Sequence, residues 1–277
     1  QLAAEGLRFA TEAGQAWPAG RIALTLQQAE PAAGQPLDAT PVTGGLFSAD
    51  HLDMALMADV AHRVPLSPGL RKLLGEMAPE GQVNGLSLRW GGPIEAPVSY
   101  LAKARLQGVS IAAAPSPEPG GIGRPGWRRA DVELEAAESG GRARLAIADG
   151  AMEFPGVFEA PVVPLRRFEA QLHWRITAAR QAGGAPQVSL SVKDARFEND
   201  DAQGELEAAW RTGDGDSFGK GGRLPGVLDL QGKLSRGSAG AVARYLPMGL
   251  PQHTRDYVRH AVREGQVTQA QFKVRGD

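Results

Sequence analysis

Apolar and polar residues alternate strictly along much of this chain, and the alternation limits the folds that it can adopt. In the clearest segment, Phe168, Leu172 and Trp174 alternate with polar residues such as Gln171 and His173. The same period of two recurs near 22–27, 86–90, 98–107, 132–147, 188–192 and 206–210. Successive side chains of a strand point to opposite faces, so each segment predicts a strand with one apolar and one polar face. Such one-sided strands are typical of antiparallel sheets.

The composition supports a protein of many strands joined by turns. Gly and Pro number 36 and 20 among 277 residues, about a fifth of the chain, against roughly 12% in ordinary proteins. A hydrophobic fraction of 42% is too high for a disordered tail. The formal net charge of −1 offers no overall attraction to nucleic acid, and the absence of Cys excludes disulfides and thiol catalysis.

Two stretches depart from the strand period and have helical spacing. In the first, Ser48 or Asp50 is predicted to cap a helix that carries Leu52 and Leu56. A second short helix is expected near 70–77, after two prolines. The other stretch runs from 239 to 264, where helical spacing at Val242 and Tyr245 is followed by two Leu-Pro pairs. After them a helix is predicted that carries Tyr257, Val258, Ala261 and Val262.

The two helical stretches end alike, which indicates an internal repeat. Glu80-Gly81-Gln82-Val83 recurs as Glu264-Gly265-Gln266-Val267, each time after a helical segment and before a strand. The predicted organisation is the end of one unit of strands (1–47), a helical insertion (48–78), a unit of antiparallel strands (79–238), a second helical insertion (239–264) and the first strand of the next unit (265–277). We interpret the chain as an internal segment of a longer polypeptide.

Motifs that carry chemistry are weak in this sequence. The segment Gly121–Gly126 has the spacing of a dinucleotide fingerprint, but prolines precede it and a strand follows it, so it predicts a loop. The segment Gly213–Lys220 fits neither a phosphate-binding loop nor a calcium loop and predicts a hairpin tip. The histidines lack the pairing with Glu that zinc hydrolases use. We therefore expect no enzyme activity, no catalytic residue, no metal and no cofactor, although a hydrolase using His253 or His260 stays a remote alternative.

The apolar strand face leaves two interpretations open. A second sheet covering it would give a β-sandwich or array module with a closed, dry core and a structural or interaction role. Alternatively, the face belongs to a long, curved sheet whose concave face stays open and holds hydrocarbon chains.

The sequence resembles the AsmA-like proteins of the YhdP type. The resemblance lies in Pro79-Glu80-Gly81-Gln82-Val83 running into Leu86-Ser87-Leu88-Arg89-Trp90, in Met152–Phe158, in Leu172-His173-Trp174 and in Arg244-Tyr245-Leu246-Pro247. It implies a bridge-like lipid transfer protein with repeating β-groove architecture, anchored in the Gram-negative inner membrane and projecting into the periplasm. The implied fold is mainly β, a long twisted antiparallel sheet that forms an open U-shaped β-groove with two short helical insertions, so the predicted strand units are β-groove units. It further implies phospholipid transfer toward the outer membrane, in support of its barrier, with membrane contacts made by parts of the protein missing from this chain.

An apolar lining without a break is all that such a role demands of the strands. We expect phospholipid acyl chains as the partner and no nucleic acid. The residues predicted to line the groove share the apolar face of their strands, where ordinary core residues are of the same types. They are Leu86, Leu88, Trp90, Tyr100, Leu106, Leu134, Leu145, Phe168, Leu172, Trp174, Ile176, Leu190 and Val192.

Overall fold

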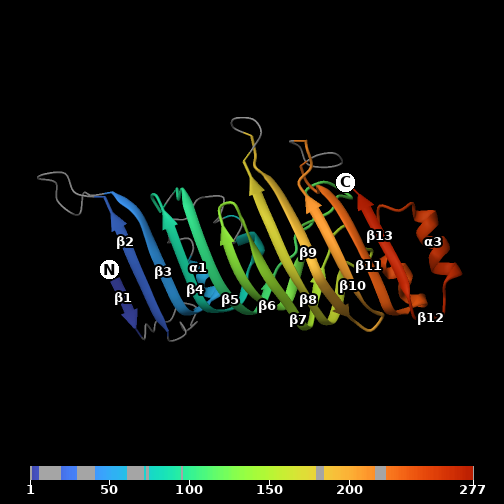
Figure 1. The fold of residues 1–277 in the computed structure, drawn as a ribbon. Helices are drawn as coiled ribbons and strands as arrows, with labels where there is room; N and C mark the ends of the chain where they lie inside the picture. The colour runs from blue at the N-terminus through green and yellow to red at the C-terminus, as the bar shows by residue number, and fades with distance from the viewer. Residues whose placement is uncertain are drawn as a thin grey trace, which may run out of the picture. The chain divides into compact units, whose positions relative to one another are not determined.

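The computed structural model describes residues 2–5, 20–29, 41–60, 72, 75–94, 96–178, 184–215 and 223–276. Within these ranges the chain is mainly β, as predicted, and its strands form one open antiparallel sheet with few, short helices. The strands follow one another in chain order from β1 to β12, and β13 pairs with β11 (Figure 1). The β-sandwich alternative is wrong, because the described strands belong to a single sheet.

The chain divides into two compact units. Unit 1 is formed by Gln1–Val109 and Asp131–Gly141, and unit 2 by Ser110–Ala130 and Arg142–Asp277. Unit 1 contains β1 (Leu2–Glu5), β2 (Arg21–Gln28), β3 (Val42–Asp53), α1 (Met54–Val60), β4 (Glu80–Gly91), most of β5 (Ser99–Ile111) and the end of β6 (Gly126–Ala137). Unit 2 contains the other parts of β5 and β6, then β7 (Gly140–Glu153) except its first two residues, β8 (Val162–Thr177), β9 (Gln187–Glu198), β10 (Ala202–Arg211), β11 (Val227–Ser238), η3 (Ala239–Tyr245), α3 (Gln252–Ala261), β12 (Gln266–Val267) and β13 (Ala270–Gly276).

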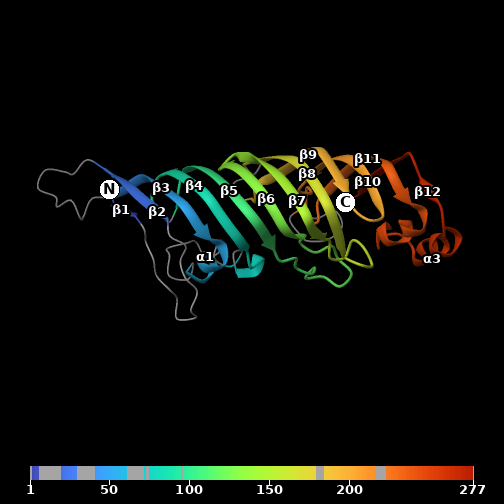
Figure 2. The same cartoon turned by 90° about the horizontal axis from the view of Figure 1, so that it is seen from below.

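The core of unit 1 lies where β3 and β4 meet α1. Ala49, Leu52 and Val83 form a buried cluster, against which Phe47 and Leu86 pack. In Figure 2, α1 lies beside the strands of its unit, and the contacts of α1 are with β3 and β4. The helix α1 therefore covers the apolar side chains of unit 1 where β3 ends and β4 begins.

The first helix begins later than predicted. Ser48 and Asp50 lie within β3, and Asp53 caps α1 instead, because its Oδ1 accepts a hydrogen bond from the Leu56 backbone N–H at 2.9 Å. Leu52 is only 1% exposed, so burial against the sheet keeps this segment in the strand although its spacing is helical. The second predicted helix, near 70–77, lies largely outside the described residues, of which Lys72 and 75–77 are helical.

The second helical insertion is confirmed. The 3₁₀-helix η3 and the α-helix α3 occupy the predicted stretch and lie beside β12 (Figure 2). The repeated tetrapeptide also plays the predicted part, because Gly81 at the start of β4 and Gly265 just before β12 both have left-handed backbone, with φ of 120° and 138°. Only glycine adopts such angles without strain. The boundaries of the predicted units stay a prediction.

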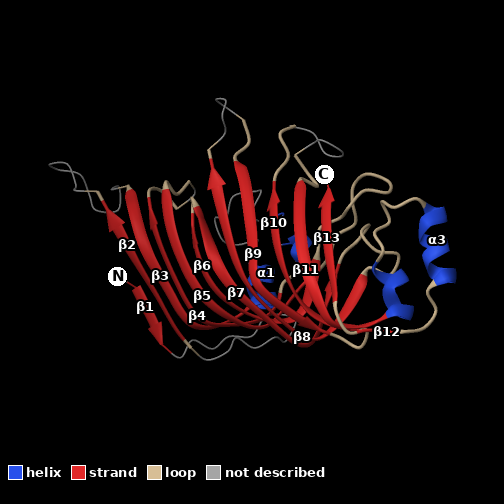
Figure 3. Cartoon of the chain, turned by 45° about the vertical axis from the view of Figure 1, so that its right-hand side comes forward, coloured by secondary structure: helices blue, strands red, loops and turns tan. Residues whose placement is uncertain are grey.

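A β-bulge interrupts the alternation of β9. This strand has one residue more than β8 and β10 at Lys193 and Asp194, so Val192 and Ala195 face the same side although they are three positions apart. The backbone of Asp194 is left-handed, with a φ of 50°. Bulges bend the strand that carries them and increase its twist, and the strands of unit 2 curve along their length in Figure 3.

Other strands show left-handed residues at similar places. In unit 2, Arg129 of β6 and Asp149 of β7 have φ of 59° and 48°, and the Arg129 guanidinium donates to the Asp149 carbonyl. In unit 1, Gly85 of β4 and Gly108 of β5 have φ of 89° and 62°, and the Gly108 N–H donates to Asp131 Oδ1 at 2.9 Å. Both units thus contain left-handed residues within their strands.

Opposite charges alternate across the polar face of unit 2. Glu169, Arg196, Glu205 and Lys233 lie opposite one another on β8, β9, β10 and β11. Cross-strand pairs of this kind contribute about 0.2–1 kcal/mol each. The row therefore favours one register, and the register decides which side chains reach the apolar face.

Replacing Asp194 tests whether the bulge stores backbone strain. Asp194→Gly and Asp194→Val both lose the hydrogen bond from Gln171 Nε2 to Asp194 Oδ2, but only Val must hold a branched side chain in left-handed backbone. We expect urea titrations to give the Val variant a free energy of unfolding about 1–2 kcal/mol lower than that of the Gly variant. Equal free energies of unfolding for the two variants would contradict the left-handed backbone at Asp194.

Candidate functional site

The strand registers of unit 2 place apolar side chains in continuous rows across the sheet. Trp174 lies opposite Leu190, Leu190 opposite Trp210, and Trp210 opposite Leu228. The next row along the strands consists of Leu172, Val192, Ala208, Leu230 and Val274. The rows show that the apolar side chains of separate strands merge into one face, which we call the apolar face.

Exposure along the apolar face changes from one end of the strands to the other. On β8, Phe168 and Ala170 are 8% and 3% exposed, whereas Leu172, Trp174 and Ile176 are half-buried. On β9, Ala195 is 0% exposed, whereas Leu190 and Val192 are half-buried. The apolar face is therefore closed near the bulges and partly open toward the other ends of the strands.

The predicted lining residues fall into the same two groups. Trp90, Leu145 and Phe168 are buried, as ordinary core residues are. The others are half-buried, namely Leu86, Leu88, Tyr100, Leu106, Leu134, Leu172, Trp174, Ile176, Leu190 and Val192. Their role as a groove lining stays a prediction, because burial and lining require the same residue types.

Unit 1 shows the same arrangement on its own strands. Leu24, Phe47 and Leu88 form one row across β2, β3 and β4. In a neighbouring row Gly45 lies opposite Trp90, and a Cβ built on Gly45 would collide with the Trp90 ring. The glycine thus makes the space in which Trp90 is buried at 6% exposure.

The apolar residues of β10 and β11 extend the apolar face beyond the residues that were predicted to line the groove. Trp210, Leu228 and Leu230 belong to its rows and are half-buried. Their alternation is visible in the sequence, so the signal that identifies them is the same period of two. Phe197 also belongs to the apolar face, opposite Phe168, but the bulge before it breaks the period.

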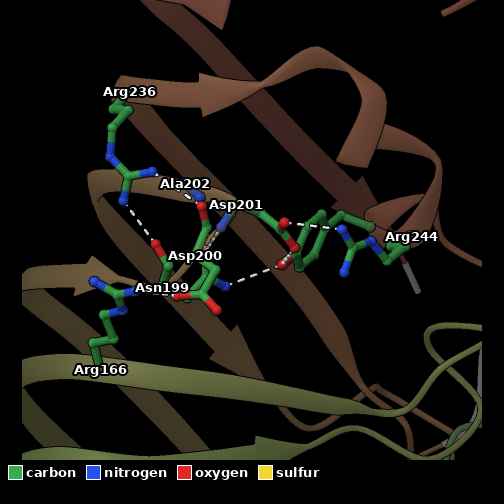
Figure 4. A network of polar contacts seen from close by, with 8 residues as sticks. Arg166, Asn199, Asp200, Asp201, Ala202, Arg236 and Arg244 are labelled. Atoms are coloured by element: carbon green, nitrogen blue, oxygen red, sulfur yellow. Dashed lines mark hydrogen bonds and ion pairs between the residues drawn. The ribbon is translucent and has the colours of Figure 1, made fainter. Parts of the chain in front are cut away.

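A polar network fastens the second helical insertion to the turn between β9 and β10 (Figure 4). The Tyr245 hydroxyl donates to Asp201 Oδ2 at 2.7 Å and accepts from Asn199 Nδ2 at 3.0 Å. Arg244 pairs with Asp201 Oδ1 at 2.9 Å, and Arg236 donates to the Asn199 carbonyl at 2.7 Å. Asn199 is buried, and its side-chain oxygen accepts two backbone N–H groups of the turn.

The same insertion also contacts the connection between β7 and β8. Phe158 meets the Tyr245 ring edge-on at a centroid distance of 6.2 Å. The Met248 N–H donates to the Val157 carbonyl at 2.8 Å, and Arg259 pairs with Glu159. Contacts with two strand connections hold the insertion firmly over the closed end of the apolar face.

Burial, reinforced by the bond to Asp201, raises the pKa of Tyr245 to about 12 from its ordinary value of 10.0. The folded protein therefore keeps this proton at a pH where the unfolded chain loses it. The stabilisation is fully present below pH 10 and is lost as the pH rises from 10 toward 12.

We expect the unfolding free energy of the protein to fall more steeply between pH 10 and 12 than that of Tyr245→Phe. At neutral pH the variant should lose about 1–2 kcal/mol, because Asn199 and Asp201 each lose a partner. Urea titrations at several pH values measure both effects. Parallel pH profiles for the two proteins would contradict the raised pKa.

The weak motifs lie where the sequence placed them. Gly123 and Gly126 lie between β5 and the start of β6, close to the backbone of residues 113–115, and no helix follows them. The predicted tip at 213–220 lies mostly outside the described residues, and Asp214 there pairs with Arg211. Across the part of the chain that the structure describes, no three His, Asp or Glu side chains gather to hold a metal, and no helix is long and apolar enough to cross a membrane.

Hollows of about 580 and 440 Å³ lie on unit 2, but their linings belong mostly to the polar face. Arg167, Glu169 and Lys233 line the first, and His173, Arg175 and Asp229 line the second. The strand alternation places these residues opposite to the apolar rows. The feature of unit 2 that is suited to apolar ligands is therefore the half-buried apolar face itself.

The fold and this face define a class of proteins built on an open antiparallel sheet with one apolar side and short helical insertions. Within that class, the chain belongs to the YhdP protein family, whose family model matches residues 1–277 and confirms the predicted AsmA-like YhdP type. Searches of curated proteins and of solved structures returned no match.

Proposed function

We propose that this chain is a segment of a periplasmic lipid-transfer bridge that carries phospholipid acyl chains along its apolar face between the inner and outer membranes. Membership of the YhdP family supports lipid transport as the general role. The phospholipid cargo, the periplasmic location with an anchor in the inner membrane, and the support of the outer-membrane barrier belong to the proposal. The role is transport, without enzyme activity.

The observation that carries the proposal is the partial exposure of continuous apolar rows in unit 2. Leu172, Trp174, Leu190, Val192 and Trp210 are all half-buried, although they share one face of a single sheet. A closed core would bury such large side chains far more completely. Contiguous apolar surface of this kind typically marks a binding site.

The energetics of lipid movement explain why such a face is sufficient. Each acyl CH₂ kept from water is worth about 0.8 kcal/mol, so exposing two chains of membrane length costs on the order of 20 kcal/mol. A continuous apolar wall replaces the aqueous path with one of nearly constant free energy. The wall needs no particular reactive group, which agrees with the weakness of catalytic motifs in the sequence.

Co-purifying lipid tests the proposal directly. We expect the purified protein to carry phospholipid detectable by mass spectrometry, and Leu172→Asp to lose it while keeping its circular dichroism spectrum. A carboxylate on the half-buried face should repel acyl chains while remaining partly hydrated.

The matched control is His173→Asp, because His173 is the next residue of β8, is exposed, and belongs to the polar face. This variant should retain the lipid. A wild-type protein without bound lipid would contradict the proposed transport. Unfolding of Leu172→Asp alone would instead favour a structural or interaction module with a dry core.

A further inference from the structure

The row formed by Trp174, Leu190 and Trp210 lies close to the open ends of its strands. One row further out are Ile176, Val188 and Thr212, where Thr212 Oγ1 accepts from the Val188 N–H at 3.1 Å. Beyond that row β8 ends at Thr177 and β9 begins at Gln187. The apolar face therefore ends just outside the two tryptophans.

In the opposite direction the apolar face deepens toward the bulges. The six residue steps from Trp174 to Phe168 span about 20 Å at the rise of an extended strand. One leaflet of a bilayer has an apolar depth of about 15 Å. An acyl chain lying along β8 would thus fit between the tryptophan row and the buried base at Phe168 and Ala170.

Tryptophan is suited to the boundary between apolar and polar surroundings. Its large ring is apolar and its N–H requires an acceptor, so it gathers at the headgroup level of membranes. Trp210 shows this division, because its Nε1 donates at 2.7 Å to the carbonyl of Pro225, which precedes β11. The polar edge of the ring thus points toward the strand ends.

The same end of the strands carries an excess of positive charge among the described residues. Arg175 and Arg211 lie there on the polar face, Arg223 lies just before β11, and of the two aspartates present, Asp214 pairs with Arg211 at 3.4 Å. The other, Asp229, is held by Arg275 at 2.6 Å. A phosphodiester just beyond the strand ends would meet this charge from the polar side of the sheet, whereas at the other end of β8 the apolar face is closed by Phe168 and Ala170, and Arg166 and Arg167 pair with Asp200 and Glu169.

From these observations we infer that Trp174 and Trp210 mark the ester level of a bound phospholipid. Its acyl chains run along the strands toward Ala170 and Ala195, and its phosphate lies at the arginine-bearing strand ends. The inference rests on the proposed function and adds to it the orientation of the lipid and the residues that set its depth.

Depth-dependent fluorescence quenching tests this orientation. The protein is loaded with phosphatidylcholine that carries a nitroxide at position 5 or at position 16 of one acyl chain. The signal of the two tryptophans is the difference between wild type and the double variant Trp174→Phe, Trp210→Phe. We expect the position 5 label to quench this signal at least twofold more strongly than the position 16 label.

Trp127→Phe is the matched control, since Trp127 lies in β6 and outside the row of Trp174, Leu190 and Trp210. It should leave the ratio between the two labels unchanged. Equal quenching by the two labels, or stronger quenching by the position 16 label, would overturn the proposed orientation. The proposed function would still stand in that case if mass spectrometry found bound lipid. Absence of bound lipid would overturn both.

Discussion

A single sheet with one apolar face must shield that face without a second sheet, and this constraint shapes the whole chain. Curvature supplies part of the answer, since bulges such as the one at Asp194 bend the strands of unit 2. The helical insertion supplies another part, because Tyr245 and Arg259 fasten it to two strand connections. Together these features bury Phe168, Ala170 and Ala195 but leave the remaining rows half-exposed. The partial shielding distinguishes this sheet from an ordinary core and makes it suitable for apolar ligands.

The polar face contributes to the same outcome through register. Glu169, Arg196, Glu205 and Lys233 alternate in sign across four strands, so a shifted pairing would bring like charges together or remove their partners. A shift by one residue would also turn every apolar side chain of a strand to the polar side. Charges that never touch a ligand therefore help to keep Trp174, Leu190 and Trp210 in one row. The two faces of the sheet depend on each other because one strand register sets the positions of the side chains on both.

Much of this architecture could be predicted from the spacing of apolar residues. The strand predicted from Phe168 to Ile176 by the period of two lies within β8, and the stretch after 239 that has helical spacing contains η3 and α3. Local spacing failed at Ser48 and Asp50, where burial of Leu52 in the sheet outweighs a helical pattern. It also missed Phe197, because an alternation cannot be followed through a bulge without knowing which residue is extra. Pairs of polar residues such as Lys193 and Asp194, inside an otherwise alternating strand, are the signal that would have revealed it.

The bulge at Asp194 has a consequence for how such a chain tolerates change. The curvature of β9 depends on how many residues lie between the apolar positions Val192 and Ala195. The type of apolar residue at these positions matters much less. An exchange of Leu for Val in a row keeps the parity of its strand, whereas deletion of Lys193 or Asp194 would remove the extra residue and shift the pairing on one side of it. Proteins of this design should therefore diverge widely by substitution while resisting single-residue insertions and deletions within their strands.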